Sequence, residues 1–181
     1  PDFSLRGNTT QTATIGTTKG GMGIELWADI APGTVENFTK LANDGFYDGT
    51  CFHRIMAGFM IQGGDPQTKD ESLENLWGTG DPGYKIEAEF SDRPHEKGVL
   101  SMARSSDPDS AGCQFFICLK AASFLDGDYT CFGELIKGED VLATLGDVDC
   151  GGGRENSRPE ERQDVLPISI VSLAPARLAL P

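Results

Sequence analysis

An arginine embedded in an apolar stretch is the first residue of this sequence that points to chemistry. Arg54 stands among strand-forming residues, and Phe59, Met60 and Gln62 follow shortly after it. A guanidinium in such surroundings needs partners, because burying an unpaired charge is costly. A salt bridge to a nearby carboxylate is the ordinary explanation, and a cation placed beside an apolar groove is the functional one.

Further aromatic and amide side chains occur far along the chain. Gln114 and Phe116 belong to one apolar run, and taken singly each aromatic residue is best interpreted as part of a core. Strict strand alternation puts Phe59 and Met60 on opposite faces, so a pocket that contains both requires a bend or a bulge. Spacing alone therefore predicts a β-barrel with a partly polar, partly apolar groove.

Other reaction chemistries have weaker support. The sequence contains no Gly-x-Ser-x-Gly motif, and His53 and His95 are its only histidines. Segment 107–112 imitates the opening of a calcium-binding loop, but Cys118 stands at the position where such a loop requires a glutamate. We therefore expect neither a metal site nor a cofactor.

Composition narrows the class of protein. The chain has 181 residues, of which 38% are hydrophobic and 24% are charged, as in one globular domain. A net charge of −13 would repel phosphate backbones, which excludes nucleic acid as an expected partner. No apolar run approaches the ~18 residues of a spanning helix, so we expect no membrane partner.

The cysteines and the N-terminal residues bear on the compartment. Five cysteines, an odd number without a CxxC pair, argue against a disulfide framework or a zinc site. Residues 1–6 include no apolar stretch like that of a signal peptide. Free thiols suit a reducing compartment, and we expect a cytoplasmic protein.

The elements that must position these residues are mostly short strands separated by turns. Alternation and turn residues predict strands over 12–18, 23–29, 51–55, 59–62, 99–103, 114–119, 129–136 and 166–173. Val35, Phe38, Leu41 and Ala42 define one apolar helical face after Pro32, and a second helix is expected over 139–145. The segments 65–92 and 147–162 have no clear period and are predicted to be loops. Eight antiparallel strands favour a closed barrel, since closure removes exposed edges.

Four motifs in order and spacing resemble those of the cyclophilins, a family of peptidyl-prolyl cis–trans isomerases. They are FHRIMAGFMIQGGD at 52–65, GVLSMA at 98–103, SAGCQFFI at 110–117, and FLDG at 124–127 with FG at 132–133. The resemblance extends over about 13–173. It implies an all-β fold, a closed eight-stranded antiparallel β-barrel capped by two short α-helices. It divides the chain into an extension (1–11), the isomerase domain (12–174) and a tail (175–181).

The resemblance also implies roles for individual residues, with Arg54 as the catalytic arginine. The implied substrate-binding residues are Phe59, Met60, Gln62, Ala103, Arg104, Ser105, Gln114, Phe116, Phe124, Leu125 and Tyr129. Among them, Phe59, Met60, Phe116 and Leu125 would line a proline pocket, and the two glutamines would support the arginine and the substrate backbone. Ala103 and Ser105 would edge a second pocket, the backbone of Arg104 would bind the peptide, and His53 would have a packing role.

Three positions differ from the best-known eukaryotic cyclophilins. Arg104 stands where an asparagine is common, Tyr129 replaces a histidine, and Phe124 replaces a tryptophan that contacts the drug cyclosporin. With these residues the chain is most similar to bacterial or plastid-type single-domain members. The implied partners are proline-containing peptides and unfolded or loop segments of proteins, with weakened affinity for cyclosporin, and we expect a monomer.

Three functions stay open at this point. The first is an active isomerase that catalyses protein folding, and the second is a proline-peptide binding module on the same barrel. A pure binder could lose Arg54 and keep its pocket, so the presence of this residue favours the enzyme. The third is a barrel that holds a small apolar ligand, which the bulky residues Ile24, Leu26, Ile117 and Phe132 oppose.

Overall fold

A computed structural model of the chain describes residues 10–173. Its eight strands are β1 (Thr10–Thr17), β2 (Gly20–Leu26), β3 (Arg54–Met56), β4 (Met60–Gly63), β5 (Val99–Met102), β6 (Phe115–Cys118), β7 (Cys131–Lys137) and β8 (Val165–Leu173). The helices are α1 (Pro32–Asn43) and α2 (Glu139–Gly146), and the loops contain short 3₁₀ turns. All the predicted strands and helices are found, with ends that differ by no more than three residues. Of the predicted extension and tail, only residues 10 and 11 are described, and both belong to β1 and pair with β8.

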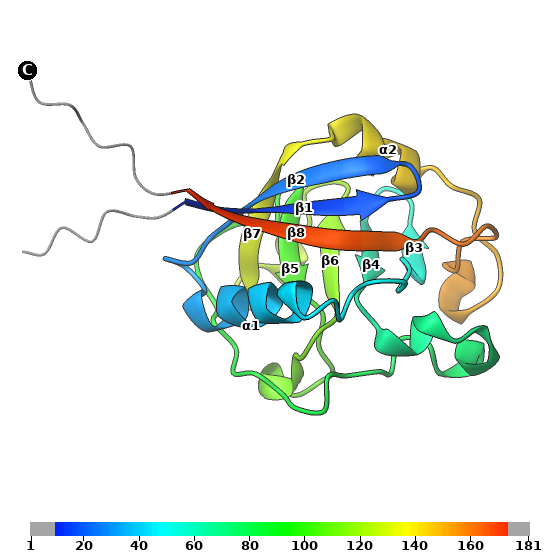
Figure 1. Cartoon of the computed structure of the whole chain (residues 1–181), viewed down its shortest axis with the longest axis horizontal. Coiled ribbons are helices and arrows are strands. Elements are labelled where there is room, and N and C mark those ends of the chain that lie inside the picture. Colours follow the sequence, from blue (N-terminus) through cyan, green and yellow to red (C-terminus); the bar gives the residue numbers. More distant parts are fainter. Residues whose placement is uncertain (1–9, 174–181) are drawn as a thin grey trace, which may run out of the picture.

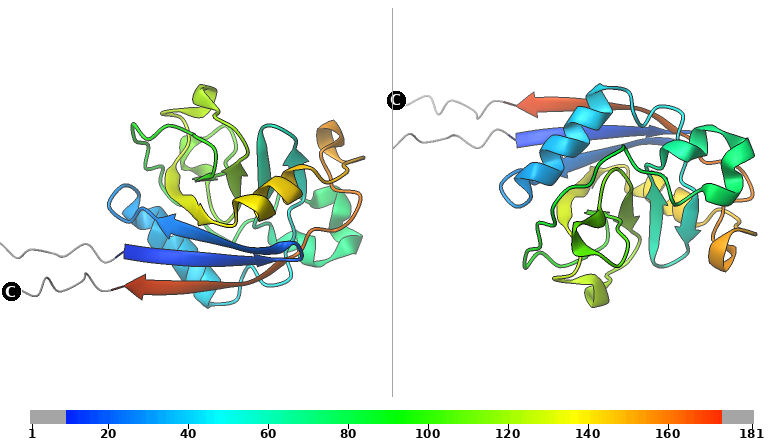
Figure 2. Two further views of the ribbon diagram at one scale, coloured as in Figure 1. Left: turned by 90° about the horizontal axis from the view of Figure 1, so that it is seen from above. Right: turned by 90° about the horizontal axis from the view of Figure 1, so that it is seen from below.

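The strands form one antiparallel sheet in the order β3-β4-β6-β5-β7-β2-β1-β8. The sheet curves so that β1, β2 and β8 lie opposite β3, β4 and β6 (Figures 1 and 2). Thr10 pairs with Leu173, so the two ends of the described chain lie side by side.

The prediction of a closed barrel is wrong, because β3 and β8 are the two free ends of the sheet. The segments that precede them are joined by a bridge between Cys51 and Asp164 and by hydrogen bonds such as that from Phe52 N to Gln163 O of 2.9 Å, but β3 and β8 themselves do not pair. β3 is only three residues long, and β8 contains Pro167, which has no N–H to donate to a further strand. The fold is therefore an open half-barrel.

The sequence explains where α1 begins and where it ends. Pro32 occupies the first turn, where its missing N–H costs nothing. Gly45 has φ +70°, and the N–H groups of Gly45 and Phe46 donate to the carbonyls of Ala42 and Leu41. This is the glycine-terminated C-cap that the sequence predicts. The helix packs against β8, and α2 contacts β2, β3 and β4 (Figure 1).

Two apolar clusters lie on opposite faces of the sheet. The cluster inside the half-barrel includes Ile24, Leu26, Ile117 and Phe132, all of which are buried. These bulky side chains fill the interior of the half-barrel. They leave no room there for the small apolar ligand that the third possible function requires. The smaller cluster on the outer face consists of Met60, Phe116, Cys118, Ala122 and Leu125, with Met56, Phe59, Ala103 and Tyr129 packed against it.

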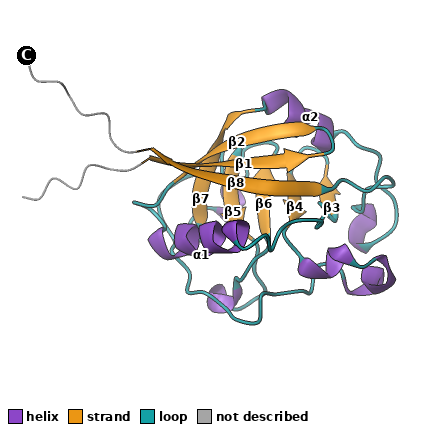
Figure 3. Ribbon diagram, in the orientation of Figure 1, coloured by secondary structure: helices purple, strands orange, loops and turns teal. Residues whose placement is uncertain are grey.

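Long connections dominate one side of the molecule (Figure 3). The segment between β4 and β5 contains the 3₁₀ turns Pro66–Lys69 and Glu71–Leu76. Asp65 anchors it, because its buried carboxylate accepts hydrogen bonds from the N–H groups of Gln67, Gly78 and Gly80. None of the helices in the described part of the chain is long and apolar enough to cross a membrane.

Candidate active site

The outer face of β4 and β6 presents the predicted pocket residues. In β4, Met60 and Gln62 point outward, whereas Ile61 is buried in the inner cluster. Gln62 lies opposite Arg54 on one side and opposite Phe116 on the other. Strand alternation and antiparallel register therefore bring the arginine, the amide and the aromatic ring onto one surface.

The bend required for Phe59 and Met60 to share a pocket is present. Phe59 does not belong to β4 but ends the turn before it, where its N–H donates to the carbonyl of Met56 at 2.9 Å. Gly58 allows this turn with φ +72°. Because Phe59 lies outside the ladder, strand alternation does not apply to it.

These side chains line a cleft of about 430 Å³. Of the predicted site residues, the cleft brings together Arg54, Phe59, Met60, Gln62, Ala103, Arg104, Phe116, Leu125 and Tyr129. Its floor is apolar, since Met60, Phe116 and Leu125 are each less than 10% exposed. A polar rim around a buried apolar floor suits a ligand that has a small apolar ring flanked by peptide groups.

The guanidinium of Arg54 lies at the edge of this floor and is fixed by three contacts. Nη1 donates to Gln62 Oε1 at 3.4 Å, and Nη2 donates to Met56 Sδ at 3.1 Å and to Glu155 Oε2 at 2.9 Å. The side chain of Arg54 is 30% exposed. The salt bridge proposed as the ordinary explanation for this arginine is therefore present, and it lies inside the cleft.

A chain of amides continues from the arginine. Gln62 Nε2 donates to Gln114 Oε1 at 3.0 Å, and Gln114 Nε2 donates to the carbonyl of Gly80 at 2.9 Å. Each amide accepts on one side and donates on the other, so the order of contacts orients both side chains. Gln114 thus supports the arginine indirectly, through Gln62.

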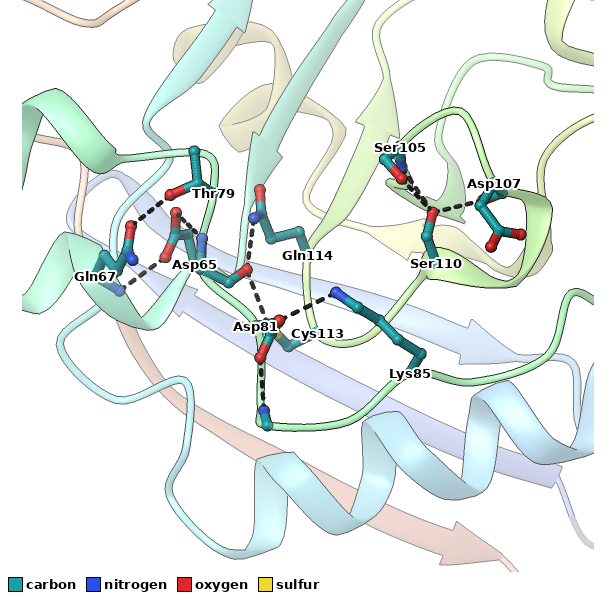
Figure 4. Close-up of polar contacts among 12 residues, drawn as sticks. Asp65, Gln67, Thr79, Asp81, Lys85, Ser105, Asp107, Ser110, Cys113 and Gln114 are labelled. Atoms are coloured by element: carbon teal, nitrogen blue, oxygen red, sulfur yellow. Dashed lines mark hydrogen bonds and ion pairs between the residues drawn. The ribbon is translucent and has the colours of Figure 1, made fainter.

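Gln114 and Ser105 line a second cleft beside the first. Ala103, Arg104 and Thr79 line both clefts, whereas Asp81 and Lys85 line only the second one. Figure 4 shows the ion pair between Asp81 and Lys85 across from Ser105, which is hydrogen-bonded to Ser110. Ala103 and Ser105, which were expected to edge a second pocket, both line this cleft.

The side chain of Arg104 contacts the loop that carries Tyr129. Its Nε and Nη2 donate to the carbonyl of Asp128 at 2.9 and 2.7 Å, and its guanidinium lies 4.5 Å from the centre of the Tyr129 ring. The arginine therefore fixes the loop that carries Tyr129. Phe124 lies at the margin, 71% exposed, with its ring 5.3 Å from that of Phe59.

A buried polar group supports the floor from behind. The ring of His95 stacks on Phe116 at 6.0 Å, its Nδ1 contacts Asp126 Oδ1 at 2.9 Å, and its Nε2 contacts Ser101 Oγ at 3.0 Å. The hydrogen bonds from the backbone and ring of His95 lower the pKa of Asp126. The sequence contained no spacing signal for this network.

His53 lines the cleft but has no acid–base partner. Its side chain is 6% exposed, and neither ring nitrogen has a hydrogen-bond partner among the described residues. Burial lowers the pKa of His53 to about 4, although Asp65 opposes the shift. The imidazole is therefore neutral at pH 7, which agrees with the expected packing role.

Residues from two loops complete the cleft, and no pattern in the sequence predicted them. They are Trp77, Gly78 and Thr79 from the segment after β4, and Gly153, Glu155, Ser157 and Arg158 from the segment before β8. Loop segments have no period from which to place a side chain. The one available signal was the need of Arg54 for a carboxylate, which did not identify Glu155.

All five cysteines are free thiols, and four of them are buried. Burial raises the pKa of Cys51 to about 11 and that of Cys113 to about 12, so these thiols are poor nucleophiles. In the described part of the chain, no three His, Cys, Asp or Glu side chains are grouped so that they could hold a metal ion.

The fold and the cleft together define a known class of protein. The family model for the cyclophilin type peptidyl-prolyl cis–trans isomerases matches residues 12–170, and the chain belongs to this family. A peptidyl-prolyl cis–trans isomerase of Synechococcus elongatus is 47% identical over 122 residues, which cover 67% of this chain and 78% of the relative. Peptidyl-prolyl cis–trans isomerase B of Bacillus subtilis is 44% identical over 127 residues, covering 69% and 82% of the two chains.

Solved structures agree with the sequence comparison. The crystal structure of a cyclophilin type isomerase of Cryptosporidium parvum, in the presence of the dipeptide Ala-Pro, superposes with a TM-score of 0.78. It is 32% identical to this chain, and the match covers 89% of this chain and 99% of the other. The expected resemblance to bacterial cyclophilins is confirmed by the cyanobacterial and Bacillus relatives.

Proposed function

We propose that this protein accelerates rotation about X–Pro peptide bonds in protein substrates, with Arg54 as the catalytic residue. The observation that carries the proposal is the position of the Arg54 guanidinium beside the apolar floor of Met60, Phe116 and Leu125. The proline ring binds on this floor. Proline-containing peptides and unfolded segments of proteins are the substrates, and the protein acts as a folding catalyst without a covalent intermediate.

The chemistry requires neither a nucleophile nor a metal, because no bond is broken. Rotation faces a barrier of ~18–20 kcal/mol, since resonance gives the C–N bond partial double-bond character. In the twisted amide the prolyl nitrogen regains a lone pair, to which Arg54 donates a hydrogen bond that a planar amide accepts poorly. The enzyme thereby stabilises the transition state more than either planar form.

The surrounding residues make this donation selective. The apolar floor excludes water, which strengthens the hydrogen bond from the guanidinium. Gln62 and Gln114 hold the arginine and bind the substrate backbone, while the backbone of Arg104 binds the peptide on the opposite side. Ala103 and Ser105 bound the second cleft, which receives a neighbouring residue of the substrate.

The test is isomerisation of an Ala-Pro peptide, followed by exchange NMR, with wild type and Arg54→Ala. We expect wild type to accelerate exchange and the variant to be slower by about a hundredfold, the usual effect of losing one preorganised donor. Arg93→Ala is the matched control, because Arg93 lies over Trp27, outside both clefts.

Two results would contradict the proposal in different ways. A wild-type rate no faster than buffer would favour the alternative function, a proline-peptide binding module. Equal rates for wild type and Arg54→Ala would leave the enzyme but remove the role of Arg54. We also propose a monomer in a reducing compartment, which the buried free thiols support.

A further inference from the structure

A carboxylate from a distant loop holds the arginine of the cleft. Nη2 of Arg54 donates to Glu155 Oε2 at 2.9 Å, across 101 positions of sequence. The other partners are weaker, since Gln62 Oε1 lies at 3.4 Å and the acceptor of Met56 is a thioether sulfur. A hydrogen bond between two charged groups is the strongest type in this set. Glu155 therefore has the largest influence on where the guanidinium points.

The backbone around Glu155 adopts an unfavourable conformation. Glu155 has φ +59° and Asn156 has φ +50°, in the left-handed region that residues other than glycine seldom occupy. Such conformations persist only where surrounding contacts impose them, and they concentrate at functional sites. Two neighbouring residues of this kind place one carboxylate against the arginine.

Contacts on both sides hold the loop in this position. On the strand side, the N–H of Ile55 donates to the carbonyl of Ser157 at 2.7 Å, next to Arg54. On the other side, Arg158 pairs with Glu74 Oε1 at 2.5 Å, and its guanidinium lies 5.2 Å from the centre of the Trp77 ring. The loop is thus attached to β3 and to the 3₁₀ turn of Glu71–Leu76.

We infer that Glu155 is a positioning residue for Arg54, an inference that rests on the proposed function. Glu155 and Gln62 hold different terminal nitrogens of the guanidinium, so the plane of the group is fixed while further N–H bonds remain for the substrate. The pair is partly exposed, with side-chain exposures of 30% and 49%, so its effect on stability is small. Its effect on catalysis is larger, because donation to the twisted nitrogen requires a set geometry.

The test compares wild type with Glu155→Gln and Glu155→Ala. Glutamine keeps the size and one acceptor oxygen but removes the charge, and alanine removes both. We expect turnover at saturating Ala-Pro peptide to fall roughly threefold with glutamine and roughly tenfold with alanine, at nearly constant KM. If the alanine variant does not fold, the isosteric glutamine variant still tests whether Glu155 positions Arg54. Asp44→Asn is the matched control, because it weakens a 2.9 Å surface pair with Lys40 on α1.

A second measurement separates positioning from a merely structural role. The ¹⁵N resonances of the Arg54 guanidinium report its rotation, and we expect faster rotation in both Glu155 variants and unchanged rotation in Asp44→Asn. Unchanged turnover and unchanged Arg54 resonances in Glu155→Gln would overturn the inference. Faster turnover in that variant would also overturn it, because Glu155 would then compete with the substrate. If wild type has no activity, the proposed function fails, and the Arg54 resonances still decide whether Glu155 holds the guanidinium.

Discussion

At the scale of single residues, Arg54 shows how neighbouring side chains hold a hydrogen-bond donor in one orientation. A long, charged side chain on a three-residue strand has many rotamers, and fixing them costs conformational entropy. Gln62, Met56 and Glu155 together offset this cost, and Gln114 in turn orients Gln62. The orientation of the Arg54 guanidinium therefore depends on several neighbouring side chains, including Glu155 from a distant loop.

Phe124 is the residue for which we predict a change in drug binding. The ring is 71% exposed beside Phe59, at a position where the family resemblance implies a tryptophan that contacts cyclosporin. Phe124→Trp restores an indole N–H donor. One additional hydrogen bond corresponds to about 1 kcal/mol, so we expect cyclosporin to bind about fivefold more tightly.

A calorimetric titration of cyclosporin measures this difference. Phe90→Trp adds an indole at another partly exposed phenylalanine and is the control. Equal affinities for wild type and Phe124→Trp would show that the indole is not what limits binding.

Strand β6 illustrates how one element serves two clusters. Phe115 points into the half-barrel, where its ring contacts those of Phe38 and Tyr47 at 5.7 and 5.6 Å. Phe116 points outward, with the rings of His95 and Tyr129 each 6.0 Å away. Alternation along a strand thus separates the residue that holds the sheet together from the residue that forms the floor of the cleft.

This division predicts opposite phenotypes for two neighbouring substitutions. Phe115→Leu should lower the free energy of unfolding by about 1–3 kcal/mol, with little change in kcat/KM of the folded protein. Phe116→Leu should lower kcat/KM about tenfold, because a flat ring under the proline is lost, with a smaller effect on stability.

Urea unfolding and exchange NMR on the same two samples distinguish the effects, and each variant is the control for the other. If Phe115→Leu lost activity at unchanged stability, the assignment of faces to functions would be incorrect.

At the scale of the whole molecule, the buried His53 links folding to pH. Burial lowers its folded-state pKa to about 4, against about 6.5 in an unfolded chain. Between these values the unfolded chain binds a proton that the folded protein does not bind. The free energy of unfolding therefore decreases as the pH is lowered from 6.5 toward 4, by about 2–3 kcal/mol from this residue.

Urea titrations at pH 7, 5.5 and 4.5 test this prediction with wild type and His53→Leu. Carboxylates titrate in the same range in both proteins, so the difference between the two pH profiles isolates the histidine. If the stabilities of wild type and His53→Leu changed with pH in parallel, the pKa of His53 would be the same in the folded and the unfolded state.

The sequence predicted the strands well but not the contacts between distant segments. Alternation and turn residues correctly predicted the strands, α1 with its glycine cap, and α2. Of the residues that the motifs proposed for the site in and beside β4 and β6, Phe59, Met60, Gln62 and Phe116 line the cleft, whereas Gln114 lines the second cleft. Closure of the barrel was predicted incorrectly, because it depends on whether β3 and β8 meet, and short-range patterns do not encode that contact.

By itself, the sequence determined the strands, their faces and the family, because period and motif are local properties of the chain. Only the tertiary structure decided which loop residues complete the cleft, among them Trp77 and Arg158, and that Glu155 pairs with Arg54. Those contacts join segments without a period, and their geometry depends on the packing of the entire sheet beneath them. The arginine that first pointed to chemistry is thus a local feature, whereas its orientation is a property of the whole fold.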